Sequence, residues 1–218
     1  MPDNDLNAPP KRSRGDVAHA LAKAAISGIP AVGGSAADLF GLVLAPPIER
    51  RRDQWFEKLH ERLKEVEQRE GLKLEDLFTN EGFVSANLKA ARIALSTHEE
   101  EKLEALRNAV LNVICDRSPD EETQAFFFQL IEPFTVTHIQ VLRLFADGSS
   151  FPPQRRRELE NRRNLTDPVV LELNARGLVE DPRPFAARNR ESDQPLVSHS
   201  WTLSPLGRQF LDFISERS

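Results

Sequence analysis

The sequence predicts a mainly α-helical protein, in which an N-terminal Ala/Gly-rich helical hairpin and a helical bundle precede a smaller C-terminal module of helices and two strands. Three observations lead to this prediction. Small residues dominate positions 17–45, apolar residues recur at helical spacing between 48 and 132, and β-favouring stretches occur only in the last third. We expect a disordered arm over 1–15, the hairpin and bundle over 16–133, and the C-terminal domain over 134–218.

The composition excludes several classes of function. The chain has 218 residues, a formal net charge of -5, one Cys and no Tyr. A single Cys allows neither an intramolecular disulfide nor a Cys-based zinc site, and it favours a reducing compartment. The first residues carry no secretory signal, so we expect a cytoplasmic location, peripheral at the inner face of a membrane if the hairpin engages lipid.

The hairpin is predicted from its helix breakers. Asp16–Ile29 forms an Ala-rich helix that is stopped by Gly28 and Pro30, and a second helix follows within Ala31–Ala45. The two glycines at 33–34 form the bend, and the two prolines at 46–47 end the second helix. Small residues on such helices allow close backbone approach, either in lipid or in a dense soluble core.

Basic residues flank this hairpin at both ends, which suits a segment that dips into a membrane from the cytoplasmic side. In composition, residues 17–45 resemble the Gly/Ala-rich hairpin of bacterial membrane-acting defence effectors. A tightly packed soluble hairpin explains the same composition, and both interpretations stay open. The residues that we assign to membrane or oligomer contact are Ile26, Gly28, Gly33, Gly34, Leu39, Phe40, Leu42 and Val43.

The bundle is predicted from capping signals. A long charged helix runs over Ile48–Glu70, and further helices begin at Thr79 or Asn80, at a Thr97/Glu100 capping box, and at Ser118. The last of these helices carries three consecutive Phe at 126–128, which span about 200° of helix surface. At least one ring should therefore point away from the core, toward a neighbouring module or a second subunit.

The C-terminal third alternates helices with two β-favouring pieces. Helices are predicted over Val136–Ala146 and Arg155–Arg163, and a third is capped by Thr166 and ends at Gly177. Strands follow over 178–180 and 197–203, and a last helix begins at 204–205 with a Ser-Pro pair.

The runs Leu171-Glu-Leu-Asn-Ala-Arg-Gly-Leu-Val179 and Trp201-Thr-Leu-Ser-Pro-Leu-Gly207 resemble the recognition helix, strand and wing of bacterial winged-helix regulators. The resemblance covers residues 134–216. It implies that the third helix of the module meets either DNA or a protein partner.

The charges of this third helix disfavour DNA, because it would expose Asp167 and Glu172 to a polyanion. The nearby arginines have three interpretations: a solvated helix in which Arg156 and Arg157 pair with Glu160, phosphate contacts, or contacts to a protein. The residues that we assign to nucleic-acid or partner contact are Arg155, Arg156, Arg157, Arg162, Arg163, Arg188 and Arg190.

No enzyme motif is present in the sequence. The segment 98–102 reads His-Glu-Glu-Glu-Lys, which is not H-E-x-x-H, and the glycines at 33–34 lack the Lys-Ser/Thr ending of a phosphate-binding loop. The pair Cys115 and His138 has nothing to orient it, and we expect Cys115 to be a packed core thiol. We therefore predict no catalytic residue, no metal, no cofactor and no enzymatic activity.

The leading hypothesis is a bacterial protein in which a winged-helix interaction or sensing module controls the Ala/Gly hairpin, with a role in antiviral defence of the abortive-infection type. A homo-oligomer and a protein partner are expected, and a membrane surface is a further partner. The first alternative is a winged-helix DNA-binding transcriptional regulator that dimerises through its helical part. The second is a scaffold with neither activity.

Overall fold

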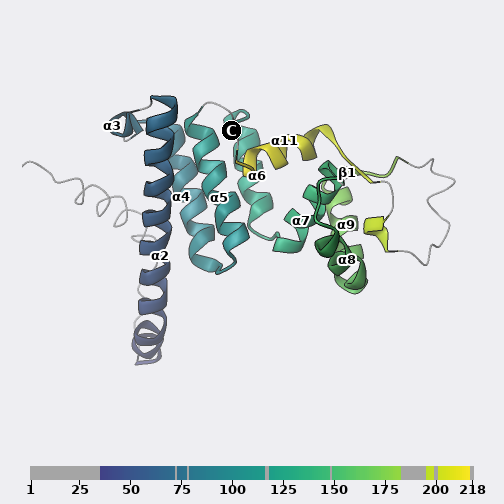
Figure 1. The fold of residues 1–218 in the computed structure, drawn as a ribbon. Coiled ribbons are helices and arrows are strands. Elements are labelled where there is room, and N and C mark those ends of the chain that lie inside the picture. Colours follow the sequence, from purple (N-terminus) through teal and green to yellow (C-terminus); the bar gives the residue numbers. More distant parts are fainter. Residues whose placement is uncertain are drawn as a thin grey trace, which may run out of the picture. The chain divides into compact units, whose positions relative to one another are not determined.

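The computed structural model describes residues 35–71, 73–77, 79–115, 118–147, 149–182, 195–198 and 201–216, and it gives the backbone alone for 35–46 and 74–75. Over these residues the fold is mainly helical with one two-stranded sheet, as predicted (Figure 1). The chain divides into two compact units, 1–60 and 61–218. The predicted arm, the first hairpin helix and the bend lie outside the described residues.

Helix α2 (Ser35–Glu70) corrects the prediction of a break at the two prolines, because it continues through positions 46–47. Each proline keeps a helical φ near -65°, but it removes one backbone hydrogen bond and crowds the carbonyl four residues earlier, so the helix continues here against a local destabilisation. The end of α2 is as predicted. Gly71 has φ +70°, and its N–H donates to the carbonyl of Glu67 at 3.0 Å.

The bundle consists of α3 (Leu74–Leu77), α4 (Glu81–Ser96), α5 (Glu100–Ile114) and α6 (Glu121–Ile131). Helix α4 packs against α5 and α6, and Figure 1 shows α4 and α5 running side by side. The predicted cap at Asn80 is confirmed, since its side chain accepts a hydrogen bond from the N–H of Phe83 at 2.9 Å.

Two other predicted caps are wrong. Helix α5 begins after Glu99, and Thr97 accepts a hydrogen bond from the N–H of Glu99 without capping the helix. Helix α6 is capped by Asp120, not by Ser118, and the Asp120 carboxylate accepts from the N–H of Thr123 at 3.0 Å. Asp caps as well as Ser does, and its negative charge also interacts favourably with the helix N-terminus.

The C-terminal part contains α7 (Val136–Ala146), α8 (Pro153–Asn161), α9 (Arg163–Ala175), β1 (Val179–Glu180), the 3-10 helix η1 (Leu196–Ser198), β2 (Thr202–Leu203) and α11 (Pro205–Ile214). The strands are antiparallel, with Val179 opposite Leu203. The predicted order of three helices, two strands and a last helix is therefore observed.

Two details of this region differ from the predictions. The stretch 196–198 is a 3-10 helix, so β2 is shorter than the predicted strand over 197–203. Thr166 does not cap a helix: α9 already begins at Arg163, and the Thr166 hydroxyl, inside the helix, donates to the carbonyl of Leu159 at 3.0 Å. A Thr hydroxyl can serve a carbonyl of the preceding turns as readily as an N–H of the following one.

Aromatic contacts join the bundle to the C-terminal part within the second unit. Phe127 of α6 lies 5.2 Å from Phe210 of α11 between ring centroids, and Phe128 lies 5.4 Å from Phe213. Phe126 is 40% exposed, which confirms that one of the three rings points away from the core. The boundary predicted between residues 133 and 134 thus lies inside the second unit, and buried side chains pack across it.

The last helix approaches β1 very closely. A Cβ at Gly207 would lie 1.8 Å from the carbonyl oxygen of Leu178, so only glycine fits there. Ser204 starts α11 as predicted, and its hydroxyl accepts from the N–H of Gly207 at 2.9 Å. Close packing therefore explains why a glycine ends the run Trp201–Gly207.

Candidate interaction surface

Helix α9 has an apolar face on each side. Its inner face is in the core, where Val169, Val170 and Leu173 are buried. Its outer face carries Leu165, 41% exposed, and Leu171, 55% exposed. With 100° between successive residues, positions 165, 168 and 171 form an arc of about 120°, and Pro168 occupies its middle. An exposed apolar arc on a rigid helix is a feature that a binding partner can cover.

The predicted arginines precede this arc in the chain, on α8, which packs against α9, and at Arg162 between the two helices. Arg155 is held at 3.6 Å from Glu101, whereas Arg156, Arg157 and Arg162 are exposed and form no ion pair among the described residues. The predicted pairing of Arg156 and Arg157 with Glu160 is wrong. Glu160 instead accepts a hydrogen bond from the hydroxyl of Ser198 in η1 at 3.2 Å.

The remaining predicted arginines are not part of this set. Arg163 donates to Asp167 at 2.8 Å, one turn further along α9. Arg188 and Arg190 lie outside the described residues. Of the seven arginines assigned to partner contact, three therefore lie in the described part of the chain without an ion pair among the described residues: Arg156, Arg157 and Arg162.

Both carboxylates that were expected to repel DNA have partners within the chain. Asp167 accepts from the N–H of Leu196 at 2.7 Å, in addition to Arg163. Glu172 lies 2.9 Å from Arg176 and 3.2 Å from His138. These contacts fix α9 to η1 and α7. Glu172 still has 41% of its side chain exposed and lies, by helical spacing, between Leu165 and Pro168, so the outer face presents this paired carboxylate beside the exposed leucines.

His138 is a buried link between α7 and α9. Its Nδ1 accepts from the N–H of Thr135 at 3.1 Å, which assigns the ring proton to Nε2 and its hydrogen bond to Glu172. The ring stacks on Phe134 at 4.6 Å. Burial lowers the pKa of His138 below its ordinary value, although the hydrogen bond to Glu172 opposes this shift. His138 thus has a structural role and does not pair with Cys115.

Lys102 is a buried charge that the sequence did not reveal. Its Nζ donates to the carbonyl oxygens of Glu132 and Phe134, each at 2.8 Å. It thus provides a hydrogen-bond donor for carbonyls that follow the C-terminal end of α6. Burial lowers the pKa of Lys102. A lysine of lowered pKa can act as a nucleophile, but this ammonium group is buried and committed to two carbonyls, which gives it a structural role.

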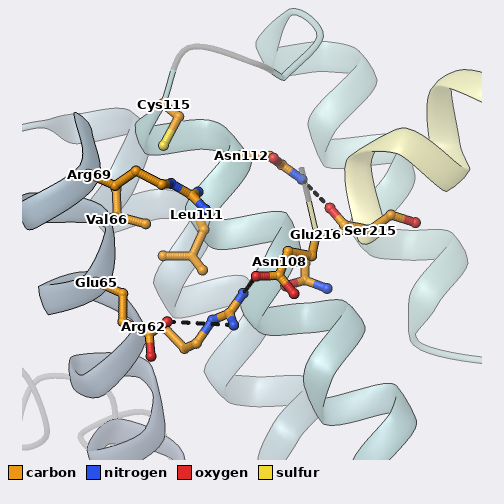
Figure 2. A pocket seen from close by; sticks show the side chains of 10 residues that line it. All are labelled: Arg62, Glu65, Val66, Arg69, Asn108, Leu111, Asn112, Cys115, Ser215 and Glu216. Atoms are coloured by element: carbon orange, nitrogen blue, oxygen red, sulfur yellow. Dashed lines mark hydrogen bonds and ion pairs between the residues drawn. The ribbon is translucent and has the colours of Figure 1, made fainter. Parts of the chain in front are cut away.

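A small cavity of about 30 Å³ lies between residues 62–69 of α2, the end of α5 and the residues after α11 (Figure 2). Cys115 lines it, together with Arg62 and Arg69. Such a volume holds about one water molecule, so the cavity does not accommodate a substrate.

Two asparagines beside this cavity hold the C-terminal end of α11. Asn112 Nδ2 lies 2.9 Å from the carbonyl oxygen of Phe213 and 3.0 Å from that of Ser215, and Asn108 Nδ2 lies 3.2 Å from that of Ile214. They replace the partners that the last carbonyls of a helix lack. This arrangement accounts for their burial in α5.

A wider groove of about 620 Å³ lies beside α5, α7 and α8. One of its lining carboxylates, Glu101, accepts hydrogen bonds from Gln140 at 3.0 Å and from Arg143 at 2.8 Å. Glu101 and Arg143, both in the lining, are therefore paired with each other. We assign no catalytic role to them.

Within the described ranges, no three His, Cys, Asp or Glu side chains are placed to share a metal ion. The same residues contain no helix that is both long and apolar enough to cross a bilayer. Of the assigned hairpin residues, Leu39, Phe40, Leu42 and Val43 belong to α2, with only their backbone described, and Ile26, Gly28, Gly33 and Gly34 lie outside the described residues.

Compared with protein-family models, curated proteins and solved structures, the chain matches none of them. The surface formed by Arg156, Arg157, Arg162, Leu165 and Leu171, called here the Arg/Leu face, is therefore interpreted from its chemistry.

Proposed function

We propose that this chain is a non-enzymatic interaction protein, in which a winged-helix module docks a protein partner through the Arg/Leu face. The observation that carries the proposal is the exposure of Leu165 and Leu171 beside three arginines that form no ion pair among the described residues. Arginines around an apolar centre are typical of protein interfaces.

The same chemistry suits DNA less well. A helix that reads base edges needs hydrogen-bonding side chains on its outer face, and a leucine contributes only apolar contact, for example with a thymine methyl group. Here Asp167 and Glu172 already have hydrogen-bond partners within the chain, and the part of Glu172 that is exposed is a carboxylate, which a polyanion repels. The outer face of α9 therefore favours a protein.

The partner is proposed to control the Ala/Gly hairpin of residues 17–45, which would then associate with a membrane or drive oligomerisation in a bacterial defence response. Dye release from anionic liposomes tests this part. We expect release by the full chain, loss of release in Gly33→Leu/Gly34→Leu, and unchanged release in the control Lys89→Ser, which changes an exposed residue outside both the hairpin and the Arg/Leu face. Equal release by the hairpin variant would contradict it.

Site-specific photocrosslinking tests the docking surface. A photoreactive amino acid placed at Leu171 should give a discrete adduct in cells that survives nuclease and is removed by protease. The adduct should disappear when Arg156, Arg157 and Arg162 are changed to Glu. A crosslinker at Lys89, an exposed residue of α4, serves as the control. A nuclease-sensitive adduct at Leu171 would contradict the proposal.

A DNA-binding regulator is the second candidate, and the three arginines without ion pairs among the described residues favour it. Fluorescence anisotropy of a labelled duplex between about 50 and 200 mM salt tests it, because each lost phosphate contact reduces the salt dependence of binding by about one unit of slope. This candidate requires saturable binding that weakens in Arg156→Ala/Arg157→Ala/Arg162→Ala. Unchanged binding in that variant would reject it.

A further inference from the structure

A second exposed surface in the described part of the chain combines an apolar ring with carboxylates. Phe126 of α6 is 40% exposed, and Glu122 lies one helical turn before it on the same side. Glu121 and Glu122 are both exposed and form no ion pair among the described residues. We call Glu121, Glu122 and Phe126 the Glu/Phe face.

We propose that the Glu/Phe face of one copy of this chain docks on the Arg/Leu face of another copy. The inference rests on the proposed function, because it names the partner of the same surface. It assigns a role to Phe126, the one ring of the three consecutive Phe residues that is exposed.

The two faces are complementary in charge. The Arg/Leu face offers three guanidinium groups, and the Glu/Phe face offers two carboxylates, so bidentate pairs can form on contact. The neighbouring Asp120 is already committed to Thr123, through its N–H at 3.0 Å and its hydroxyl at 2.7 Å. The carboxylates that remain are therefore those on the exposed side of α6.

The apolar parts match in the same way. Phe126 is an exposed aromatic ring with Glu122 one turn before it, and Leu165 and Leu171 are exposed on the helix that follows the three arginines in the chain. An aromatic residue that fills an apolar site inside a polar rim is the usual centre of a protein interface. Burial of these three side chains would remove most of the large apolar exposure that the described residues show on α6 and α9.

Each helix is held in place from behind. Phe127 and Phe128 fix α6 against α11, and Val170 and Leu173 anchor α9 in the core. Both faces are thus presented on supported helices and left open to solvent within one chain. Their contact takes place between copies.

The contact is heterologous, because it joins two different surfaces. Each added copy therefore leaves one free face of each kind, and the assembly grows until it closes into a ring or continues as a filament. A contact of this size with several charges is weak and depends on salt. Self-association should accordingly rise with protein concentration and fall with ionic strength.

Charge reversal with the full chain tests the inference by sedimentation velocity. Glu121→Lys/Glu122→Lys makes both faces basic, and Arg156→Glu/Arg157→Glu/Arg162→Glu makes both acidic. Each variant alone should sediment as a monomer at concentrations where the wild type associates. Their equimolar mixture should recover association, since each basic face then meets an acidic one. Lys89→Glu should behave as the wild type.

Circular dichroism and the thermal midpoint first establish that each variant is folded. The inference is overturned if the wild type stays monomeric at every concentration, if either reversal variant associates as the wild type does, or if the mixture of folded variants fails to recover association. A nuclease-resistant adduct at Leu171 together with any of these results would leave the proposed function standing. A nuclease-sensitive adduct would reject the proposed function itself.

Discussion

The two faces of α9 differ in what surrounds their apolar residues. On the inner face Leu173 has no exposed surface, and on the outer face Leu171, two residues away, is 55% exposed. Two carboxylates of the helix, Asp167 and Glu172, are bound to other elements. One side of the helix therefore stabilises the fold, while the other contributes little to it.

The contrast identifies a surface of α9 that folding does not explain. A face whose polar groups are satisfied and whose apolar groups are buried is explained by folding alone. The outer face is not explained in this way, because two leucines and three arginines lie there with neither burial nor an ion pair among the described residues. Substitutions on the inner face should thus lower the stability of the fold, whereas substitutions on the outer face should leave it nearly unchanged and weaken binding.

The largest effect is expected for the matched pair on α9 itself. Leu173→Ala should lower the free energy of unfolding by about 3 kcal/mol, because it leaves a cavity in the core. Leu171→Ala should change it by about 0.5 kcal/mol or less. Urea denaturation of both variants measures the difference. Equal losses would show that the outer face also stabilises the fold.

Gly207 tests the packing of α11 against the backbone of Leu178, the residue before β1. Gly207→Ala should cost about 2 to 3 kcal/mol, because the added Cβ meets the Leu178 carbonyl oxygen at 1.8 Å and a backbone atom must move. Gly177→Ala is the control. It has φ +72° but nothing within 4 Å, so only the backbone strain of about 1 kcal/mol remains. Similar thermal midpoints for the two variants would contradict the close approach of α11 to β1.

Asn112→Ala removes a buried donor at the end of α11. We expect a loss of about 2 kcal/mol, since the carbonyls of Phe213 and Ser215 lose this partner. The comparison is with the exposed Asn174, whose side chain donates to a single carbonyl, that of Val179, and whose change to Ala should cost about 1 kcal/mol or less. A larger loss of stability for Asn174→Ala in denaturant titrations would show that its contact between α9 and β1 matters more than the contact of Asn112 with the end of α11.

The smallest effect concerns pH. The folded pKa of His138 lies below its ordinary value of 6.5, because burial disfavours the charged ring. Below pH 6.5 the unfolded chain therefore binds this proton more readily than the folded one, and stability falls with the pH. Unfolding of the wild type should lose more free energy between pH 7.5 and 5.5 than that of His138→Gln. Identical pH slopes would contradict a neutral buried ring.

Local signals predicted much of the fold. The caps at Asn80 and Ser204 and the helix ends at Gly71 and Gly177 depend on chemistry within a few residues, which the sequence displays directly. Helix geometry predicted that at least one of the three consecutive Phe rings would be exposed, and the structure identifies that ring as Phe126. Where two neighbouring residues were both suitable caps, as at 118–120, the local rule did not choose between them.

The candidate site could be predicted only in part. The sequence located the arginine cluster, but which members remain available depends on Glu101 and Asp167, and the first of these lies far away in the chain. Lys102 and Asn112 appeared to be ordinary polar positions, because their partners are about 30 and 100 residues further on. Periodicity does not contain such long-range contacts.

Leucine-methyl NMR spectra test two points in one experiment: the difference between the inner and outer faces of α9, and the docking of a second copy of the chain on the outer face. As the concentration of the wild-type chain rises, the methyl signals of Leu165 and Leu171 should shift or broaden, those of Leu173 should stay in place, and Glu121→Lys/Glu122→Lys should abolish the change. Outer-face signals that ignore concentration and instead shift on addition of a DNA duplex would contradict docking of a second copy and would favour the DNA-binding alternative.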